Sequence, residues 1–159
     1  MPDPNFSIDT CSLVTPWRDW YRPLKFPRVW DLVDELMVQG RLFASRAVLS
    51  EINRQDDTLA EWVNQRREFF LELDGAAQEH VQRITGTHFP QFQNSPGDDI
   101  WADPEVIALA LAEEREVLVV TEENRSGGPH KLKIPDVCDI EGVECIKFAD
   151  MLDRVDHDF

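Results

Sequence analysis

The chain has 159 residues, of which 42% are hydrophobic and 30% are charged, and this composition favours one folded domain over residues 1–159 and excludes extended disorder. Its 31 Asp and Glu residues against 16 Lys and Arg give a net charge of -15, which argues against a broad nucleic-acid-binding surface. No apolar run approaches the roughly 20 residues of a membrane helix, and the first residues lack a signal-peptide pattern. Three cysteines without Cys-x-x-Cys spacing predict reduced thiols, so we expect a cytoplasmic protein with no membrane association.

Apolar runs and helical periodicity alternate along the chain. Short apolar runs predict strands at residues 5–9, 41–45, 69–73, 117–120 and 144–148. Apolar residues at helical intervals predict helices over residues 29–37, 48–52, 59–63, 76–84, 104–111 and 134–140, and around residue 151. The proline-rich residues 16–27 and residues 88–97 predict loops or short helical turns. This alternation predicts a three-layer α/β/α sandwich with a central, mostly parallel sheet.

Local signals predict where several of these elements begin and end. Gly40 is placed to follow a helix, and Ser45 is placed to cap the next one. Asp103 followed by Pro104 predicts an N-cap and the first residue of a helix. The unbroken apolar run at residues 117–120 predicts a central parallel strand that is covered on both faces.

Acidic residues accompany several of these apolar runs. Asp9 ends the first strand, Glu51 lies on a helix just beyond the second, Asp103 begins a helix, and Glu123 follows the strand at residues 117–120. Because ligands of open α/β sheets bind where the strands end, we expect such carboxylates to converge in one crevice. Converging carboxylates repel one another unless a cation neutralises them, and hard oxygen ligands suit Mg²⁺ or Mn²⁺. The pattern therefore predicts a metal site.

Some of these acids also have ordinary structural explanations. Asp103 before Pro104 is the pattern of a helix cap, and Glu51 near a helix start favours the helix dipole. Asp9 has no such explanation, because an acid at the end of a buried strand has a desolvation cost unless it is paired or bound to a cation. The three acids together favour a metal site.

Four motifs in order resemble the PIN-domain family of metal-dependent nucleases over essentially the whole chain. They are Ile-Asp-Thr at residues 8–10, Ser45 with Val-Leu-x-Glu-Ile at residues 48–52, Asp-x-x-Val-Ile-Ala-x-Ala at residues 103–110, and Val-Val-Thr-x-Glu at residues 119–123. A later segment, Lys-Ile-Pro-Asp-Val-Cys at residues 133–138, is similar to a PIN-like branch of uncharacterised prokaryotic proteins.

The resemblance implies specific roles for residues that match the motifs. Asp9, Glu51 and Asp103 match the acids that hold one or two Mg²⁺ or Mn²⁺ ions. The family usually has Asp at the fourth acidic position, where this chain has Glu123, and Glu122 or Asp136 could take that role instead. Thr10 and Thr121 match positions whose hydroxyl groups orient a carboxylate or a water.

The resemblance also implies an activity and partners. The expected activity is hydrolysis of RNA phosphodiester bonds, and many small PIN proteins are toxins of toxin–antitoxin pairs, silenced by a protein that covers the site. A strongly acidic chain suits a basic antitoxin or another basic partner, and PIN domains often form homodimers. These are expectations from family resemblance.

Two short segments are basic, in contrast to the rest of the chain. Residues 17–30 carry four basic residues against one acid, and residues 124–134 carry Arg125, Lys131 and Lys133 with no acid. Either segment is a solvated loop or a site that holds substrate phosphates.

Two other classes of function are compatible with part of the pattern. A haloacid-dehalogenase-like phosphatase with Asp9 as nucleophile requires a second Asp two positions later, where this chain has Cys11. A non-catalytic protein-interaction module that keeps a degenerate PIN-like fold is the stronger alternative, because Glu123 departs from the family pattern and the net charge is -15.

Overall fold

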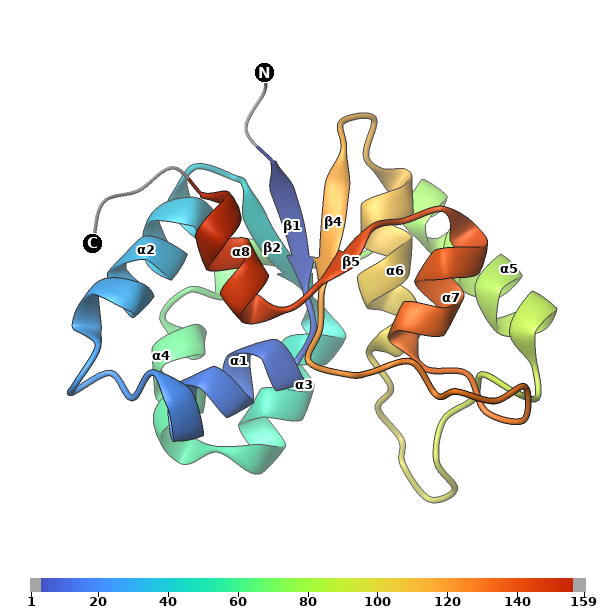
Figure 1. The fold of residues 1–159 in the computed structure, drawn as a ribbon, viewed down its shortest axis with the longest axis horizontal. Coiled ribbons are helices and arrows are strands. Elements are labelled where there is room, and N and C mark those ends of the chain that lie inside the picture. The colour runs from blue at the N-terminus through green and yellow to red at the C-terminus, as the bar shows by residue number, and fades with distance from the viewer. Residues whose placement is uncertain (1–3, 156–159) are drawn as a thin grey trace.

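A computed structural model of the chain, which describes residues 4–155, has a five-stranded parallel sheet at its centre (Figure 1). The strands are β1 (Asn5–Ile8), β2 (Leu42–Ser45), β3 (Phe70–Leu71), β4 (Val117–Val120) and β5 (Cys145–Ile146). Their order across the sheet is β3-β2-β1-β4-β5, and every neighbouring pair is parallel. All five carboxyl ends therefore lie at one edge of the sheet.

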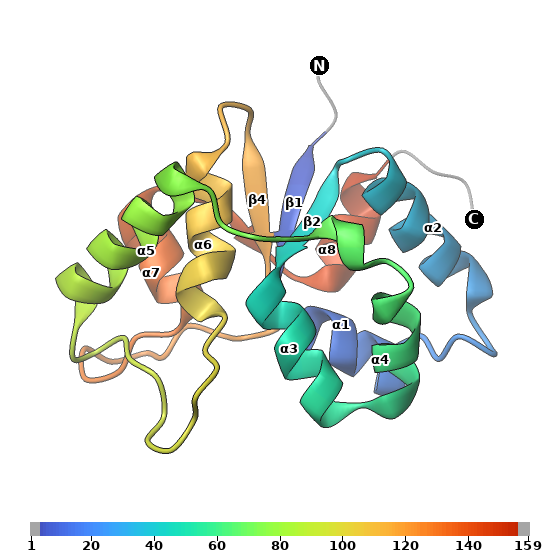
Figure 2. The same cartoon turned by 180° about the vertical axis from the view of Figure 1, so that it is seen from behind.

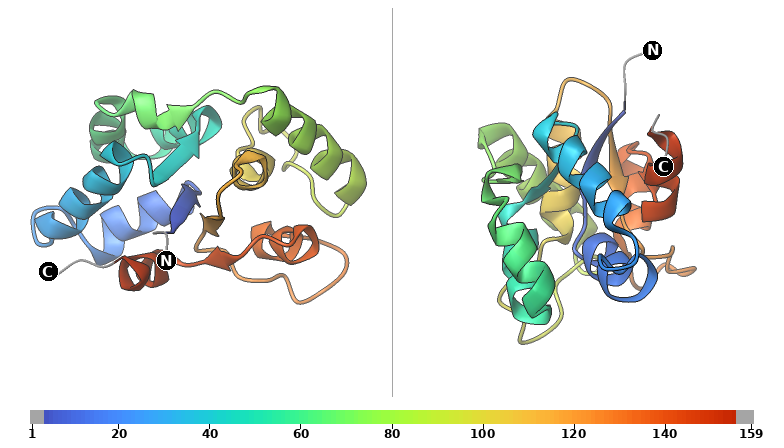
Figure 3. Two further views of the ribbon diagram at one scale, coloured as in Figure 1. Left: turned by 90° about the horizontal axis from the view of Figure 1, so that it is seen from above. Right: turned by 90° about the vertical axis from the view of Figure 1, so that its left-hand side faces the viewer.

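Eight α-helices of the described residues surround this sheet. They are α1 (Cys11–Thr15), α2 (Pro27–Val38), α3 (Arg46–Gln55), α4 (Asp57–Asn64), α5 (Gly75–His88), α6 (Asp103–Ala112), α7 (Ile134–Glu141) and α8 (Phe148–Arg154). Helices α1, α2 and α8 lie on one side of β1 and β4, and α5, α6 and α7 lie on the other, as Figure 2 shows from behind and Figure 3 from above. The predicted three-layer α/β/α architecture is confirmed.

The two central strands pair through apolar residues that are fully buried. Phe6 lies opposite Leu118, and Ile8 lies opposite Val120. These four side chains are at most 1% exposed, because helices cover both faces of β1 and β4. Burial of such side chains is worth about 1.5–3 kcal/mol each, so the centre of the sheet is a main source of stability.

Helix α6 is the buried helix of the fold and it carries Asp103. It packs against β1, β2 and β4 on one side and against α5 and α7 on the other. Its apolar residues, including Val106 and Ile107, therefore surround the helix instead of forming one stripe. The buried Ser7 hydroxyl of β1 donates to the Val106 carbonyl at 2.8 Å, which fixes the first turns of α6 against the central strand.

The predicted boundaries hold at most positions. The Ser45 hydroxyl accepts a hydrogen bond from Val48 N at 3.4 Å, and Gly40 follows α2 with a φ of 72°, in the left-handed region where glycine is favoured. The proline-rich residues 16–27 continue α1 as a π-helical turn, Pro16–Trp20, before α2 begins. Strands β3 and β5 are shorter than predicted, since each lies at a sheet edge and pairs on one side only.

Two expectations about helix starts are wrong. Asp103 is the first residue of α6 and not its N-cap, which is Ala102. Glu51 lies in the middle of α3, so the dipole of the first helical turn does not explain its position. The ordinary structural roles considered for these two acids are therefore not the ones that the fold provides.

Among residues 4–155, no helix has the length and apolar composition that crossing a membrane requires.

Candidate metal centre

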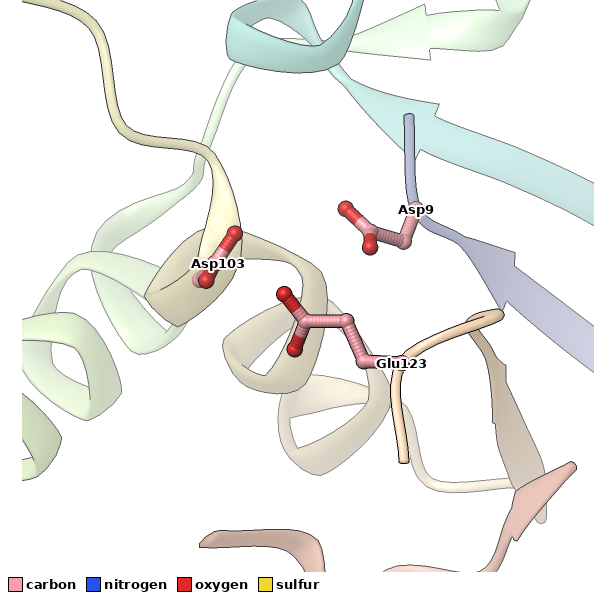
Figure 4. Close-up of side chains that lie close together, drawn as sticks. All are labelled: Asp9, Asp103 and Glu123. Atoms are coloured by element: carbon pink, nitrogen blue, oxygen red, sulfur yellow. The ribbon is translucent and has the colours of Figure 1, made fainter. Parts of the chain in front are cut away.

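Three carboxylates meet where β1 and β4 end. Asp9 follows β1 directly, Glu123 lies three residues after β4, and Asp103 begins α6. One oxygen from each of the three lies within 4.8 Å of the others, and the side chains point toward one another in Figure 4. Because Asp9 N donates to Val120 O at 2.8 Å, the two strand ends are held together, and the acids that follow them must share one site.

Thr121 holds two parts of this group in place. Its hydroxyl donates to Asp9 Oδ2 at 2.9 Å and accepts a hydrogen bond from Glu123 N at 3.2 Å. The same carboxylate oxygen of Asp9 accepts a hydrogen bond from Cys11 Sγ at 3.1 Å. The Thr121 hydroxyl therefore orients the carboxylate of Asp9 and fixes the backbone of Glu123.

Glu51 lies beside the group of three but outside it. The Thr10 hydroxyl donates to Glu51 Oε1 at 3.1 Å, and the backbone of Ala102 also donates to this carboxylate. Glu51 lines the same cavity of about 260 Å³ as Asp9, Asp103 and Glu123. Its position suits a supporting carboxylate at the side of the cavity.

Among the three candidates for the fourth acidic position, Glu123 is the one in the cluster. Glu123 Oε2 accepts a hydrogen bond from Ile134 N, the first residue of α7, at 3.0 Å. The extra methylene group of Glu therefore lets one side chain brace a helix start and also reach the other acids. This gives a physical reason for the departure from the family pattern.

Glu122 and Asp136, the other two candidates, brace the structure at other points. Glu122 Oε1 accepts hydrogen bonds from Phe148 N at 2.7 Å and from the Ser12 hydroxyl at 3.2 Å. The Asp136 carboxylate accepts from Lys133 N at 2.8 Å and from Ser126 N at 3.0 Å. Both acids thus stabilise helix starts and the adjoining loop, and neither is a member of the cluster.

The three basic residues predicted to contact substrate have different surroundings. Arg125 forms two hydrogen bonds with Asp139, at 2.6 and 2.8 Å, so its guanidinium group is already engaged. Lys131 and Lys133 line a second cavity together with Asp103 and Glu123, and their charges partly offset the rise in the pKa of Glu123.

Without a bound cation, the site disfavours the ionised forms of its own carboxyl groups. Burial, followed by the nearby Asp9 carboxylate, raises the pKa of Asp103 to about 8 and that of Glu51 to about 7. Burial likewise raises the pKa values of Asp9 and Glu123. Within residues 4–155, no Lys or Arg forms an ion pair with any of these four acids. A divalent cation would remove the repulsion, so a hard, all-oxygen donor set fits Mg²⁺ or Mn²⁺.

Two residues that touch this site were not predicted from the sequence. Cys11 hydrogen-bonds Asp9, and burial raises the pKa of its thiol. The Trp101 side chain donates a hydrogen bond to Asp103. Each lies two residues from a predicted acid in the sequence, and this proximity is the one feature of the sequence that could have indicated a contact with the site.

The fold and the site together define a parallel α/β protein whose neighbouring strand ends carry carboxylates that could hold a metal. The chain belongs to the family described as a domain of unknown function, DUF4411, whose model matches residues 6–159. Comparison with curated proteins found no match. The acidic group and the parallel sheet are consistent with the PIN-like resemblance, and the family description names no activity.

We expect the metal-free protein to lose stability as the pH rises from about 4 to about 8. Asp103 has a folded pKa of about 8 and an ordinary value of 3.8, so within this range the folded chain binds a proton that the unfolded chain releases. Because Asp103 is partly exposed to solvent, we expect a fall in Tm of about 4–8 °C, or roughly 2 kcal/mol. Thermal unfolding in EDTA between pH 5 and pH 8 measures it.

Added Mn²⁺ should restore the Tm at pH 8, and Asp103→Asn should flatten the pH dependence. Asp31, an exposed residue of α2, offers a matched control, and Asp31→Asn should keep the slope of the native protein. If Tm falls equally with pH in Asp103→Asn and Asp31→Asn, the cluster is not the source of the pH dependence.

We expect Glu123→Asp to bind Mn²⁺ about 10-fold more weakly than the native protein, although Asp is the residue of the family pattern. The shorter side chain cannot reach both the cluster and Ile134 N, which Glu123 contacts at 3.0 Å. Isothermal titration calorimetry measures the affinity. Glu105→Asp is the control, because Glu105 lies on α6 with Asp103 but outside the cluster. Unchanged or tighter Mn²⁺ binding by Glu123→Asp would contradict this explanation.

Proposed function

We propose that this protein is a metal-dependent endoribonuclease that hydrolyses RNA phosphodiester bonds. The observation that carries the proposal is the meeting of Asp9, Asp103 and Glu123 within 4.8 Å at the carboxyl edge of a parallel sheet. Open α/β sheets bind ligands at this edge. One acid of the cluster is buried and two are half-buried, and no Lys or Arg of residues 4–155 forms an ion pair with them, which favours a divalent ion. The four motifs that resemble the PIN-domain family favour RNA as the substrate.

Each residue of the cluster has a part in this proposal. Asp9, Asp103 and Glu123 would hold Mg²⁺ or Mn²⁺, which when bound supplies a more acidic water and offsets the charge that develops on the phosphate. Thr121 keeps the Asp9 carboxylate in its observed orientation through the 2.9 Å hydrogen bond. Glu51, whose pKa is raised to about 7, is placed to accept a proton from a water in the cavity near neutral pH.

Positive side chains line both cavities beside the acids. Lys131 and Lys133 line the cavity of about 320 Å³, and Arg18, which also pairs with the exposed Asp19 at 3.3 Å, lines the cavity of the cluster. A phosphodiester that lies over the carboxylates would have cations on both flanks. These few contacts let a chain with a net charge of -15 bind RNA locally.

We expect the purified protein to cleave an end-labelled mixed RNA pool in Mn²⁺ and to lose this activity in EDTA. Asp9→Asn should lower the cleavage rate by at least about 100-fold. Loss of a group that only hydrogen-bonds a metal ligand typically lowers metal affinity or activity about 10- to 100-fold, and loss of a ligand itself should cost more. Asn keeps an oxygen for the Thr121 hydroxyl, so the variant should fold. Asp31→Asn, which removes the same charge from exposed α2, should retain full activity.

The alternative, a non-catalytic interaction module, predicts a different outcome. Such a protein would neither cleave the pool nor bind Mn²⁺ in calorimetry, and Asp9→Asn would at most raise its stability by relieving repulsion. That combination of results would overturn the proposed nuclease.

We also propose that the protein acts as the toxin of a toxin–antitoxin pair and is silenced by a partner with a basic segment. The net charge of -15 and the four acids that line the cavity suit a Lys- or Arg-rich chain that covers the site. The partner should co-purify from the native cells in about 0.1 M salt. It should dissociate in about 1 M salt, where the Debye length is only about 3 Å and attraction between exposed charges is largely screened. It should also inhibit cleavage when added back.

Weaker retention of the partner by the double variant Asp9→Asn with Asp103→Asn would support contact at the cavity. The absence of any bound protein at both salt concentrations would contradict this part of the proposal, whatever the outcome of the cleavage assay.

A further inference from the structure

A second cavity, of about 320 Å³, lies between two long loops at the carboxyl edge of the sheet. One loop, residues 89–102, joins α5 to α6, and the other, residues 121–133, joins β4 to α7. Leu132 N donates to Gln91 O at 2.8 Å, which ties the two loops together below the sheet in Figure 1. We name this space the loop cavity.

The loop cavity is continuous with the candidate metal centre. Glu51, Asp103 and Glu123 line both the loop cavity and the cavity of about 260 Å³ that contains Asp9. A molecule whose phosphate lies over the carboxylates can therefore place its next group in the loop cavity. Its volume is at the lower end of the range for small-molecule sites, which suits one nucleotide and not a long segment.

The walls of the loop cavity combine an aromatic surface with positive charge. Trp101 is partly exposed, and its ring contacts the buried ring of Phe92 with the centroids 4.8 Å apart. Because Phe92 is 2% exposed, it supports the indole ring from the protein interior. Lys131 and Lys133 supply positive charge, Asp98 adds one carboxylate, and Ile100 and Leu132 add apolar surface.

This combination matches the chemistry of an unpaired nucleotide. Bases stack on aromatic side chains in single-stranded nucleic acids, and lysines contact the adjoining phosphates. A base within a duplex is already stacked and paired, so it cannot enter a cavity of this kind without being extruded. The exposed amide of Gln93, at the same cavity, is placed to contact the edge of a base.

We propose that the loop cavity binds the base of the nucleotide adjacent to the scissile phosphate, with Trp101 as the stacking surface. This inference rests on the proposed ribonuclease function and makes the substrate an unpaired, single-stranded RNA segment. It also gives Trp101 two roles, because its side chain hydrogen-bonds Asp103. Base binding and the orientation of one carboxylate thus depend on the same side chain.

The two roles of Trp101 can be separated by two substitutions. Trp101→Phe keeps an aromatic ring and removes the N–H donor, whereas Trp101→Leu removes both. We expect Trp101→Leu to bind a 12-nucleotide single-stranded RNA about 10-fold more weakly and Trp101→Phe to bind it within about threefold of the native affinity. Binding is measured by fluorescence anisotropy in Ca²⁺, with thermal unfolding as the check that each variant is folded.

Trp20 provides the matched control for these measurements. It is 47% exposed and lies outside the loop cavity, so Trp20→Leu should leave the RNA affinity within twofold of the native value. A duplex of the same sequence should bind at least about 10-fold more weakly than the single strand.

Crosslinking of the native protein tests the placement without any substitution. A single-stranded RNA that carries 4-thiouridine should crosslink to residues 91–101 or 131–133. Crosslinks confined to residues 17–28, or native affinity in Trp101→Leu, would overturn the base site and would leave the proposed nuclease intact if cleavage persists. If the native protein neither cleaves nor binds any RNA, the proposed function and this inference are both overturned.

Discussion

The structure is arranged around one electrostatic constraint: carboxylates meet where the two central strands end, and no Lys or Arg of residues 4–155 forms an ion pair with them. The adjacency of β1 and β4 forces Asp9 and Glu123 into one place, and α6 adds Asp103 from the side. Hydrogen bonds from Thr121 and Ile134 N hold these side chains in position but do not neutralise them. Their raised pKa values are the measure of that cost, and a divalent cation is the simplest means of offsetting it.

Much of the fold followed from local rules that act over a few residues. The alternation of apolar runs predicted the order of strands and helices, and Ser45 and Gly40 were assigned correctly because caps and left-handed positions depend on immediate neighbours. The role of Asp103 was harder to predict. A one-residue shift in the start of α6 separates an N-cap from the first helical residue, and local patterns place helix ends only to within one or two residues.

The candidate site was predictable in its composition but not in its detailed membership. Glu122 and Glu123 are adjacent in sequence, and the choice between them is made by backbone donors far along the chain, Phe148 N for one and Ile134 N for the other. Arg125 pairs with Asp139, which no pattern in the sequence indicates. Contacts of this kind depend on how separate elements pack, so sequence rules that describe single elements cannot supply them.

The strand order has a consequence for the synthesis of this protein. Asp9 directly follows the first strand, but its partners in the cluster lie beyond residue 100, and Glu123 is braced by a helix that begins still later, at Ile134. A chain growing on the ribosome therefore cannot assemble the cluster until most of its length has emerged. Any metal ion that these three carboxylates hold together is therefore bound by a nearly complete chain and not by a short nascent segment.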